Sequence, residues 1–137
     1  MNRTLLQELA EERVQDAAAL LGASQWSGAY YLSGYAIECG LKASIAKYTD
    51  QYDFPDKAFA HSCYTHDLKV LITIADLKKQ LEADARIKPA LGVNWAIVKD
   101  WDEKSRYRRW TELQARQLFA AIDDQNDGVM SWLRMHY

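Results

Sequence analysis

The chain has 137 residues, of which 49% are hydrophobic and 26% charged, a balance typical of a folded globular domain rather than a disordered segment. Its net charge of −2 excludes a strong overall attraction to nucleic acid, so any such binding has to be local. We expect one domain, residues 1–137, in a reducing cytoplasm, because the chain has only two cysteines and opens without the apolar block of a signal peptide.

The first predicted elements are two helices joined by a short connection. Thr4 is the predicted N-cap of a helix that runs to about Leu21, and Gly22 is predicted to end it. Ser24 is the predicted cap of a second helix that covers residues 24–48. So short a connection makes the two helices antiparallel neighbours.

The second helix is predicted to be the most buried element, because apolar and small residues cover most of its circumference. Gly34 is expected to allow another part of the chain to approach closely, so that a larger residue there would overfill the core. A neighbouring stripe is polar, and we expect it to form a structural cluster of two phenols, a carboxylate and an ammonium: Tyr31, Tyr35, Glu38 and Lys42. These charges also interrupt the apolar stretch before it is long enough to span a membrane.

A carboxylate in an apolar helix needs a partner of opposite charge. Glu38 and Lys42 stand in the favourable i,i+4 order for an ion pair. We further expect Glu38 to accept a charge-assisted hydrogen bond from Arg106, which would bring a distant part of the chain to the second helix. This bond would belong to a polar cluster at one end of the second helix that also contains Lys42, His66 and Tyr107.

Residues 49–65 have no sustained period and are predicted to form an ordered loop. Beyond this loop, Thr65 or Asp67 is the predicted cap of a short helix. Asp76 is the predicted cap of another short helix.

The last part of the chain is predicted to contain one long helix. Pro89 interrupts the preceding pattern, and residues 93–101 are expected to form only a further turn or two. Thr111 and Gln114 form a capping box for the long helix, which is predicted to continue to about Leu133. With no alternating strand pattern in the sequence, the predicted fold is all-α: an antiparallel helical bundle of four main helices plus one or two short helices.

The densest group of chemically versatile side chains in the loop is HSCYTH, in which His61, Cys63 and His66 are plausible zinc ligands. A structural zinc site usually needs a fourth ligand, and the sequence offers no paired second cluster. We therefore expect no metal and no cofactor, and we interpret the three residues as part of a loop and a helix cap.

A second group combines cations with aromatic rings over a short stretch before the last helix. It could hold phosphate through arginine and stack a base on an aromatic ring, with these candidate residues: Arg106, Tyr107, Arg108, Arg109 and Trp110. Asp100, Asp102 and Glu103 stand close enough in sequence to neutralise the arginines. A structural role, in which the arginines pair with these acids and cover aromatic rings, therefore remains open beside the binding role.

Three parts of the sequence together resemble the HEPN domain family: AYYLSGYAIECGLKA at residues 29–43, the His66-Asp67-Leu68 step that opens a short helix, and Trp101 followed by Arg106 and Tyr107. The resemblance extends from about Leu6 to Leu133. It implies a bundle of four main helices with a shorter one, pairing as a homodimer, and a role in a prokaryotic toxin–antitoxin, defence or nucleotide-handling system. It also implies a partner protein of the nucleotidyltransferase type.

Many proteins of that family are metal-independent ribonucleases, in which an arginine of the last helix is followed by a histidine four to six residues later. This chain lacks the pair, since His136 follows Arg134 by only two positions. We therefore expect a module that binds RNA or a nucleotide, or a partner protein, rather than an enzyme of the usual kind.

Two other functions remain open. A divergent ribonuclease would use His66 as general acid or base and Arg106 to stabilise the phosphorane, with Glu38 as a weaker candidate. A structural protein would serve only for dimerisation or for docking a partner. The spacing of these residues does not decide among the three functions.

Overall fold

The computed structural model describes residues 2–48 and 57–137, apart from the side chains of residues 57–59. The part of the predicted 49–65 loop that precedes residue 57 lies outside the described residues. The described residues form helices and no strand, which confirms the all-α prediction. In chain order the helices are α1 (Arg3–Gly22), α2 (Trp26–Lys47), α3 (Lys57–Ser62), α4 (Leu68–Ile74), α5 (Lys78–Ile87), α6 (Pro89–Val98), the 3₁₀ helix η1 (Glu103–Tyr107), α7 (Glu112–Asp123) and α8 (Val129–Leu133).

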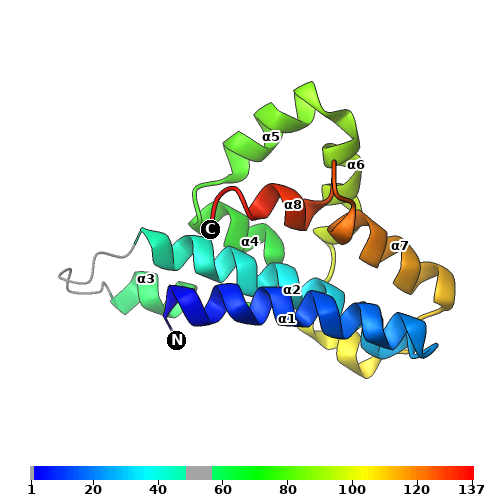
Figure 1. Ribbon diagram of the computed structural model, residues 1–137. Helices are drawn as coiled ribbons and strands as arrows, with labels where there is room; N and C mark the ends of the chain where they lie inside the picture. The colour runs from blue at the N-terminus through cyan, green and yellow to red at the C-terminus, as the bar shows by residue number, and fades with distance from the viewer. Residues whose placement is uncertain (1, 49–56) are drawn as a thin grey trace.

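α2 is the central element of the fold. It lies antiparallel to α1 along most of its length, and α4, α7, α8 and η1 also pack against it (Figure 1). Twelve of its residues are buried, more than in any other described helix, as its broad apolar circumference predicts. α5 and α6 form a helical hairpin that extends away from the α1–α2 pair (Figure 1). None of the described helices is both long and apolar enough to cross a membrane.

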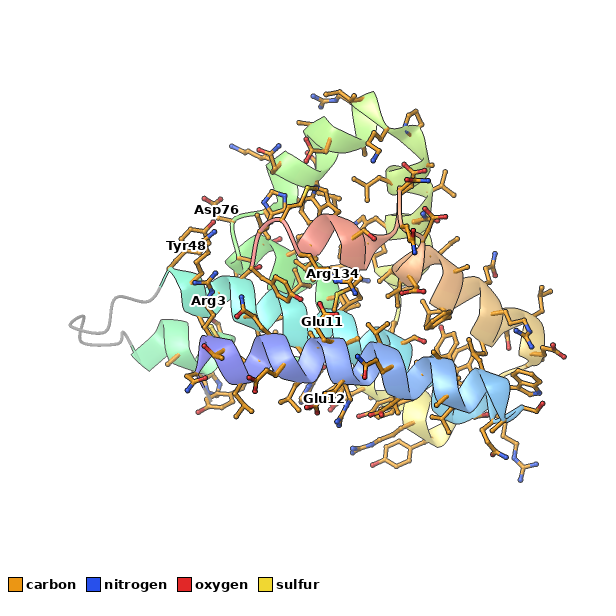
Figure 2. The ribbon with its side chains drawn as sticks, in the orientation of Figure 1. Arg3, Glu11, Glu12, Tyr48, Asp76 and Arg134 are labelled. Atoms are coloured by element: carbon orange, nitrogen blue, oxygen red, sulfur yellow. The ribbon has the colours of Figure 1, made fainter. Side chains whose placement is uncertain are left out.

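The C-terminal end of the chain is held against α1 by an ion pair. Arg134, just after α8, donates two hydrogen bonds to the carboxylate of Glu11, at 2.8 Å from Nε and 2.9 Å from Nη2 (Figure 2). These bonds to the guanidinium hold the pKa of Glu11 below its usual value. Such a two-pronged arginine–carboxylate contact fixes geometry as well as charge, so it holds α8 against α1.

Two residues that were predicted to open helices instead close the preceding ones. Ser24 and Asp76 have φ of 59° and 58°, in the left-handed region. In each case the residue and its successor donate backbone hydrogen bonds to the last turn of the helix before, which is the Schellman C-cap. The predicted caps of α2 and α5 were therefore wrong. The predicted cap of α1 was also wrong, because Asn2 rather than Thr4 accepts the hydrogen bond from Leu5 N, at 2.8 Å.

The other helix boundaries follow the sequence in part. Asp67 caps α4, and Thr111 and Gln114 form the predicted capping box of α7. The loop predicted for residues 49–65 contains α3, and Pro89 occupies the first turn of the ten-residue helix α6 instead of only breaking the pattern. The predicted long last helix is divided into α7 and α8.

The division follows from a tight turn at Asp124. The Asp124 carboxylate accepts hydrogen bonds from the backbone N–H groups of Asn126 and Asp127, at 2.9 and 2.8 Å. A Cβ atom on Gly128 would lie only 2.3 Å from the carbonyl oxygen of Asp124, so the turn requires glycine there. Local side-chain bonds to the backbone compete with helix formation, and here they end α7.

Candidate functional site

Glu38 is the buried charge around which the polar residues of α2 are arranged. Its side chain is only 3% exposed. Its carboxylate accepts a hydrogen bond from Lys42 Nζ at 3.2 Å, and His66 Nδ1 lies 3.0 and 2.9 Å from the two carboxylate oxygens. Both partners reach the same carboxylate, so the buried charge is compensated by two hydrogen-bonded groups.

The expected hydrogen bond between Glu38 and Arg106 was wrong. His66, just before α4, takes that place, with Nδ1 2.9 Å from Glu38 Oε2, while Arg106 lies against Tyr107. The sequence predicts that Glu38 has a partner, but it does not identify that partner as His66. His66 was expected near Glu38 and Lys42 in one polar cluster, and the structure brings these three residues together, but Arg106 rather than His66 was expected to donate to Glu38.

The second ring nitrogen of His66 faces another carboxylate. Nε2 lies 3.2 Å from Glu103 Oε2, at the start of η1. His66 and Glu103 are about equally accessible, with side chains 42% and 44% exposed, whereas Glu38 is buried. One imidazole ring therefore connects the core helix α2, the start of α4 and the segment that carries the arginines.

The two tyrosines of the predicted polar cluster lie one turn apart on α2. The rings of Tyr31 and Tyr35 are stacked with centroids 6.0 Å apart, and Tyr31 also contacts the indole of Trp101 at 5.8 Å. Burial, with smaller contributions from the Cys39 thiol and Glu38, raises the pKa of Tyr35 to about 12. Tyr35 is therefore a neutral phenol at physiological pH, and it supports the site structurally.

The acidic residues that precede the arginine segment, residues 106–109, contact other groups instead of the arginines. Asp102 accepts a hydrogen bond from Lys104 N at 2.8 Å and so caps η1, Asp100 lies 3.7 Å from Lys69 Nζ, and Glu103 contacts His66. Arg106, Arg108 and Arg109 are exposed, and none of them forms an ion pair with any residue that the structure describes. The expected pairing of these arginines with the neighbouring acids was therefore wrong, whereas the expected covering of an aromatic ring is found at Arg106, which lies over Tyr107.

The two aromatic candidates of this segment differ in environment. Tyr107 is 75% exposed, and the guanidinium carbon of Arg106 lies 4.7 Å from the centre of its ring. Trp110 is half-buried, and its ring is stacked on Tyr30 with centroids 3.7 Å apart. Its indole N–H donates to the carbonyl of Ser105, and its backbone N–H donates to Ser27 Oγ. Tyr107 is thus open for stacking, whereas Trp110 anchors the segment to α2.

The structure does not assemble the acid–base pair of the divergent ribonuclease. His66 lies between two carboxylates, while Arg106 lies against Tyr107, and no contact joins His66 and Arg106. At the other end of the chain, the ring of His136 packs against Trp132 with centroids 4.4 Å apart. Burial lowers the pKa of His136.

The candidate zinc ligands are separated by their surroundings. His61 is exposed at the end of α3, Cys63 packs against the core, and His66 is occupied by Glu38 and Glu103. In the part of the chain that the structure describes, no three His, Cys, Asp or Glu side chains are arranged to hold a metal ion.

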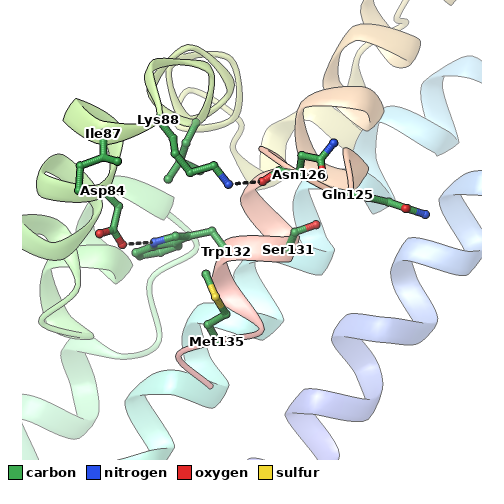
Figure 3. A pocket seen from close by; sticks show the side chains of 9 residues that line it. Asp84, Ile87, Lys88, Gln125, Asn126, Ser131, Trp132 and Met135 are labelled. Atoms are coloured by element: carbon green, nitrogen blue, oxygen red, sulfur yellow. Dashed lines mark hydrogen bonds between the residues drawn. The ribbon is translucent and has the colours of Figure 1, made fainter.

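A groove of about 500 Å³ between α5 and α8 was not anticipated from the sequence (Figure 3). On one side Asp84 accepts a hydrogen bond from the indole N–H of Trp132 at 2.8 Å, and this bond lowers the pKa of the carboxyl group. On the other side Lys88 Nζ donates to the carbonyl of Asn126 at 2.6 Å. The groove forms where the α5–α6 hairpin meets α8, so only the tertiary arrangement reveals it. A smaller groove of about 300 Å³ lies beside His66 and Glu103.

These observations define an all-α domain with a buried, paired carboxylate and an exposed arginine segment. Comparison of the chain with protein-family models, with curated proteins and with solved structures found no match.

Proposed function

We propose that this chain is a HEPN-like module that binds RNA or a nucleotide through the arginine segment, defined as residues 106–109. The observation that supports the proposal is that three arginines within four residues are exposed without ion pairs to any described residue, beside an exposed tyrosine. Arginine binds phosphate through two parallel N–H donors, and an exposed phenol ring offers a face on which a base can stack.

The proposal is for binding rather than cleavage. RNA cleavage through the 2′-hydroxyl needs a general base or acid within hydrogen-bond reach of the reacting group, close to a cation that stabilises the phosphorane. Among the described residues no histidine contacts an arginine of the segment. A binding module needs only the phosphate contacts and the stacking surface.

The proposal includes assembly into a homodimer and action beside a partner protein, of the nucleotidyltransferase type, in a prokaryotic toxin–antitoxin, defence or nucleotide-handling system. These parts derive from the family that the sequence resembles. Large exposed side chains near the segment support an interface, since Tyr107 is 75% and Leu113 76% exposed. Sedimentation that gives a monomer at high micromolar concentration would remove the homodimer from the proposal.

Fluorescence anisotropy with a labelled single-stranded RNA tests the phosphate contacts. Arg108→Ala should weaken binding and should reduce the slope of log affinity against log salt by about 0.7, the slope that each neutralised phosphate of a single strand contributes. Arg86→Ala is the matched control, because Arg86 is also exposed and has no ion pair with a described residue, but it lies on α5. Equal losses in both variants would refute a local site.

Stacking is tested separately from charge. Tyr107→Ala should weaken binding by roughly 5- to 150-fold, the range of one base–aromatic stack, while leaving the salt slope unchanged. Tyr64→Ala is the control, since Tyr64 is 76% exposed and Tyr107 75%. If labelled RNA and labelled nucleotide both bind the Tyr107→Ala protein as tightly as they bind the unmodified chain, Tyr107 stacks no base.

A further inference from the structure

The contact of His66 with two carboxylates depends on the protonation state of its ring. Nδ1 is within hydrogen-bond distance of Glu38, so it carries the proton when the ring is neutral, because a carboxylate only accepts. Nε2 then presents a lone pair to Glu103 Oε2 at 3.2 Å. In the imidazolium both nitrogens carry protons, and both contacts are attractive.

Loss of the ring proton affects the two contacts unequally. Glu38 is buried, keeps the Nδ1 hydrogen bond and has Lys42 as a second partner at 3.2 Å. Glu103 is 44% exposed and has no other ion-pair partner among the described residues. The contact that breaks on deprotonation is therefore the one to Glu103, whose carboxylate is free to turn elsewhere.

The other charged groups around the His66 ring include equal numbers of cations and anions. They come from the start of α4, from the residues after α6 and from η1, and they are three cations and three anions: Lys69, Lys99, Lys104, Asp67, Asp100 and Asp102. Asp102 and Asp67 cap helices, and Asp100 lies near Lys69, so their positions are set by other contacts. The ring proton is thus the variable charge that acts on Glu103.

The geometry of η1 determines where a released Glu103 can go. Side chains three residues apart on a 3₁₀ helix eclipse each other, so Arg106 is the cation on the same face of η1 as Glu103. A carboxylate that pairs with Arg106 competes with phosphate for the same guanidinium. While Glu103 contacts His66, Arg106 lies against Tyr107 and has no carboxylate partner among the described residues.

We infer that His66 is a proton-dependent positioning residue for the arginine segment: its protonated ring holds Glu103 away from Arg106, and its deprotonation releases Glu103 and weakens binding of the phosphates of RNA or a nucleotide. The inference rests on the proposed function, since it concerns regulation of the same site. Binding is therefore tighter at acidic than at alkaline pH.

The test measures affinity for labelled single-stranded RNA at about pH 5.5 and about pH 8, the range over which histidine is the side chain that ordinarily changes charge. The unmodified chain should bind more tightly at the lower pH. In His66→Asn the amide nitrogen replaces Nδ1 and Nε2 is lost, and in Glu103→Gln the charge is lost. In both variants the affinity ratio between the two pH values should be smaller by roughly two- to fivefold, the range of one exposed ion pair.

His61→Asn is the matched control, because His61 is an exposed histidine without an ion pair to a described residue, and it should keep the ratio of the unmodified chain. Glu103→Gln keeps the test valid if His66→Asn does not fold, since Glu103 is a surface residue. Backbone NMR shifts of residues 103–107 without RNA should follow the titration of His66 in the unmodified chain and not in Glu103→Gln.

The outcomes separate the two proposals. RNA and nucleotide binding absent at both pH values would overturn the proposed function and this inference with it. Binding that is present and has the same pH ratio in the unmodified chain, His66→Asn and Glu103→Gln would overturn the inference alone. Shifts of residues 103–107 that do not respond to His66 would also overturn the inference.

Discussion

Gly34→Ala should destabilise the fold, although alanine is normally the better helix former. An added Cβ would lie 2.2 to 2.3 Å from three atoms of the Trp101 indole, far inside van der Waals contact. Trp101 is only 2% exposed, and its ring is rigid, so it cannot move aside without losing burial. The close approach that was predicted at Gly34 exists, but an aromatic side chain makes it rather than a second backbone.

The magnitude follows from two limits. If the ring shifts within the core, overpacking costs about 1 to 3 kcal/mol, and the gain in helix propensity offsets about 1 kcal/mol of it. If the ring leaves the core, about 150 to 250 Å² of apolar surface returns to water at about 25 cal/mol/Å², a loss of about 4 to 6 kcal/mol before the same offset. We expect a net loss between these limits, about 2 to 4 kcal/mol.

Urea denaturation followed by circular dichroism measures the free energy of unfolding. Gly28→Ala is the matched control in the same helix, because its Cβ would meet only the end of the flexible Leu20 side chain, at 3.3 Å. That variant should be more stable by about 0.5 to 1 kcal/mol. A Gly34→Ala protein that is as stable as Gly28→Ala would refute the packing of Trp101 on α2.

Two further predictions concern buried polar groups of α2. Glu38→Ala should lower the free energy of unfolding by about 1.5 to 3 kcal/mol, at the low end for a buried charge because Lys42 and His66 can both reach water. Glu38→Gln keeps the shape of the side chain and loses only its charge, so it should be destabilised less. Equal losses in denaturation would show that the charge alone accounts for the effect and that shape contributes nothing. Burial raises the pKa of Cys39 from 9.0 to about 11, so its reaction with a thiol reagent near pH 8 should be about a hundredfold slower than that of an ordinary thiol. Cys63 is the internal comparison, and labelling of Cys39 at the rate of Cys63 would contradict the burial.

The parts of the fold that were predictable depend on residues close together in the chain. The capping box of α7 needs only Thr111 and Gln114, three positions apart, and the structure contains it. The apolar circumference that made α2 the central helix is likewise a property of one segment. Local patterns of this kind survive folding because no distant residue is needed to complete them.

Ser24 and Asp76 show why some local patterns mislead. Serine and aspartate favour the N-cap because their oxygens accept backbone hydrogen bonds, but aspartate also tolerates the left-handed conformation that ends a helix. Whether such a residue closes one helix or opens the next depends on where the preceding helix ends. Here both residues lie one position beyond the C-cap of the helix before, and the sequence alone does not fix that position.

The partner of Glu38 illustrates a different limit. Burial of a carboxylate implies a cation or donor nearby, but His66 and Arg106 satisfy that rule equally well in the sequence. The choice between them depends on which segment crosses α2 at Glu38, and α4 does so. The consequence was larger than one hydrogen bond, because His66 also contacts Glu103, one of the acids that the sequence placed beside the arginines.

The segment from Trp101 to Trp110 is held to α2 at three places, and this explains how exposed arginines can form a defined site. Trp101 packs on Gly34 at one end, Trp110 stacks on Tyr30 at the other, and Glu103 is connected through His66 to Glu38 between them. Binding usually costs affinity because side chains and loops must become ordered. A short segment that is fixed at both ends and near its middle loses less freedom when phosphate binds. We therefore propose that the buried charge of Glu38, through His66 and Glu103, positions the arginine segment for the proposed binding.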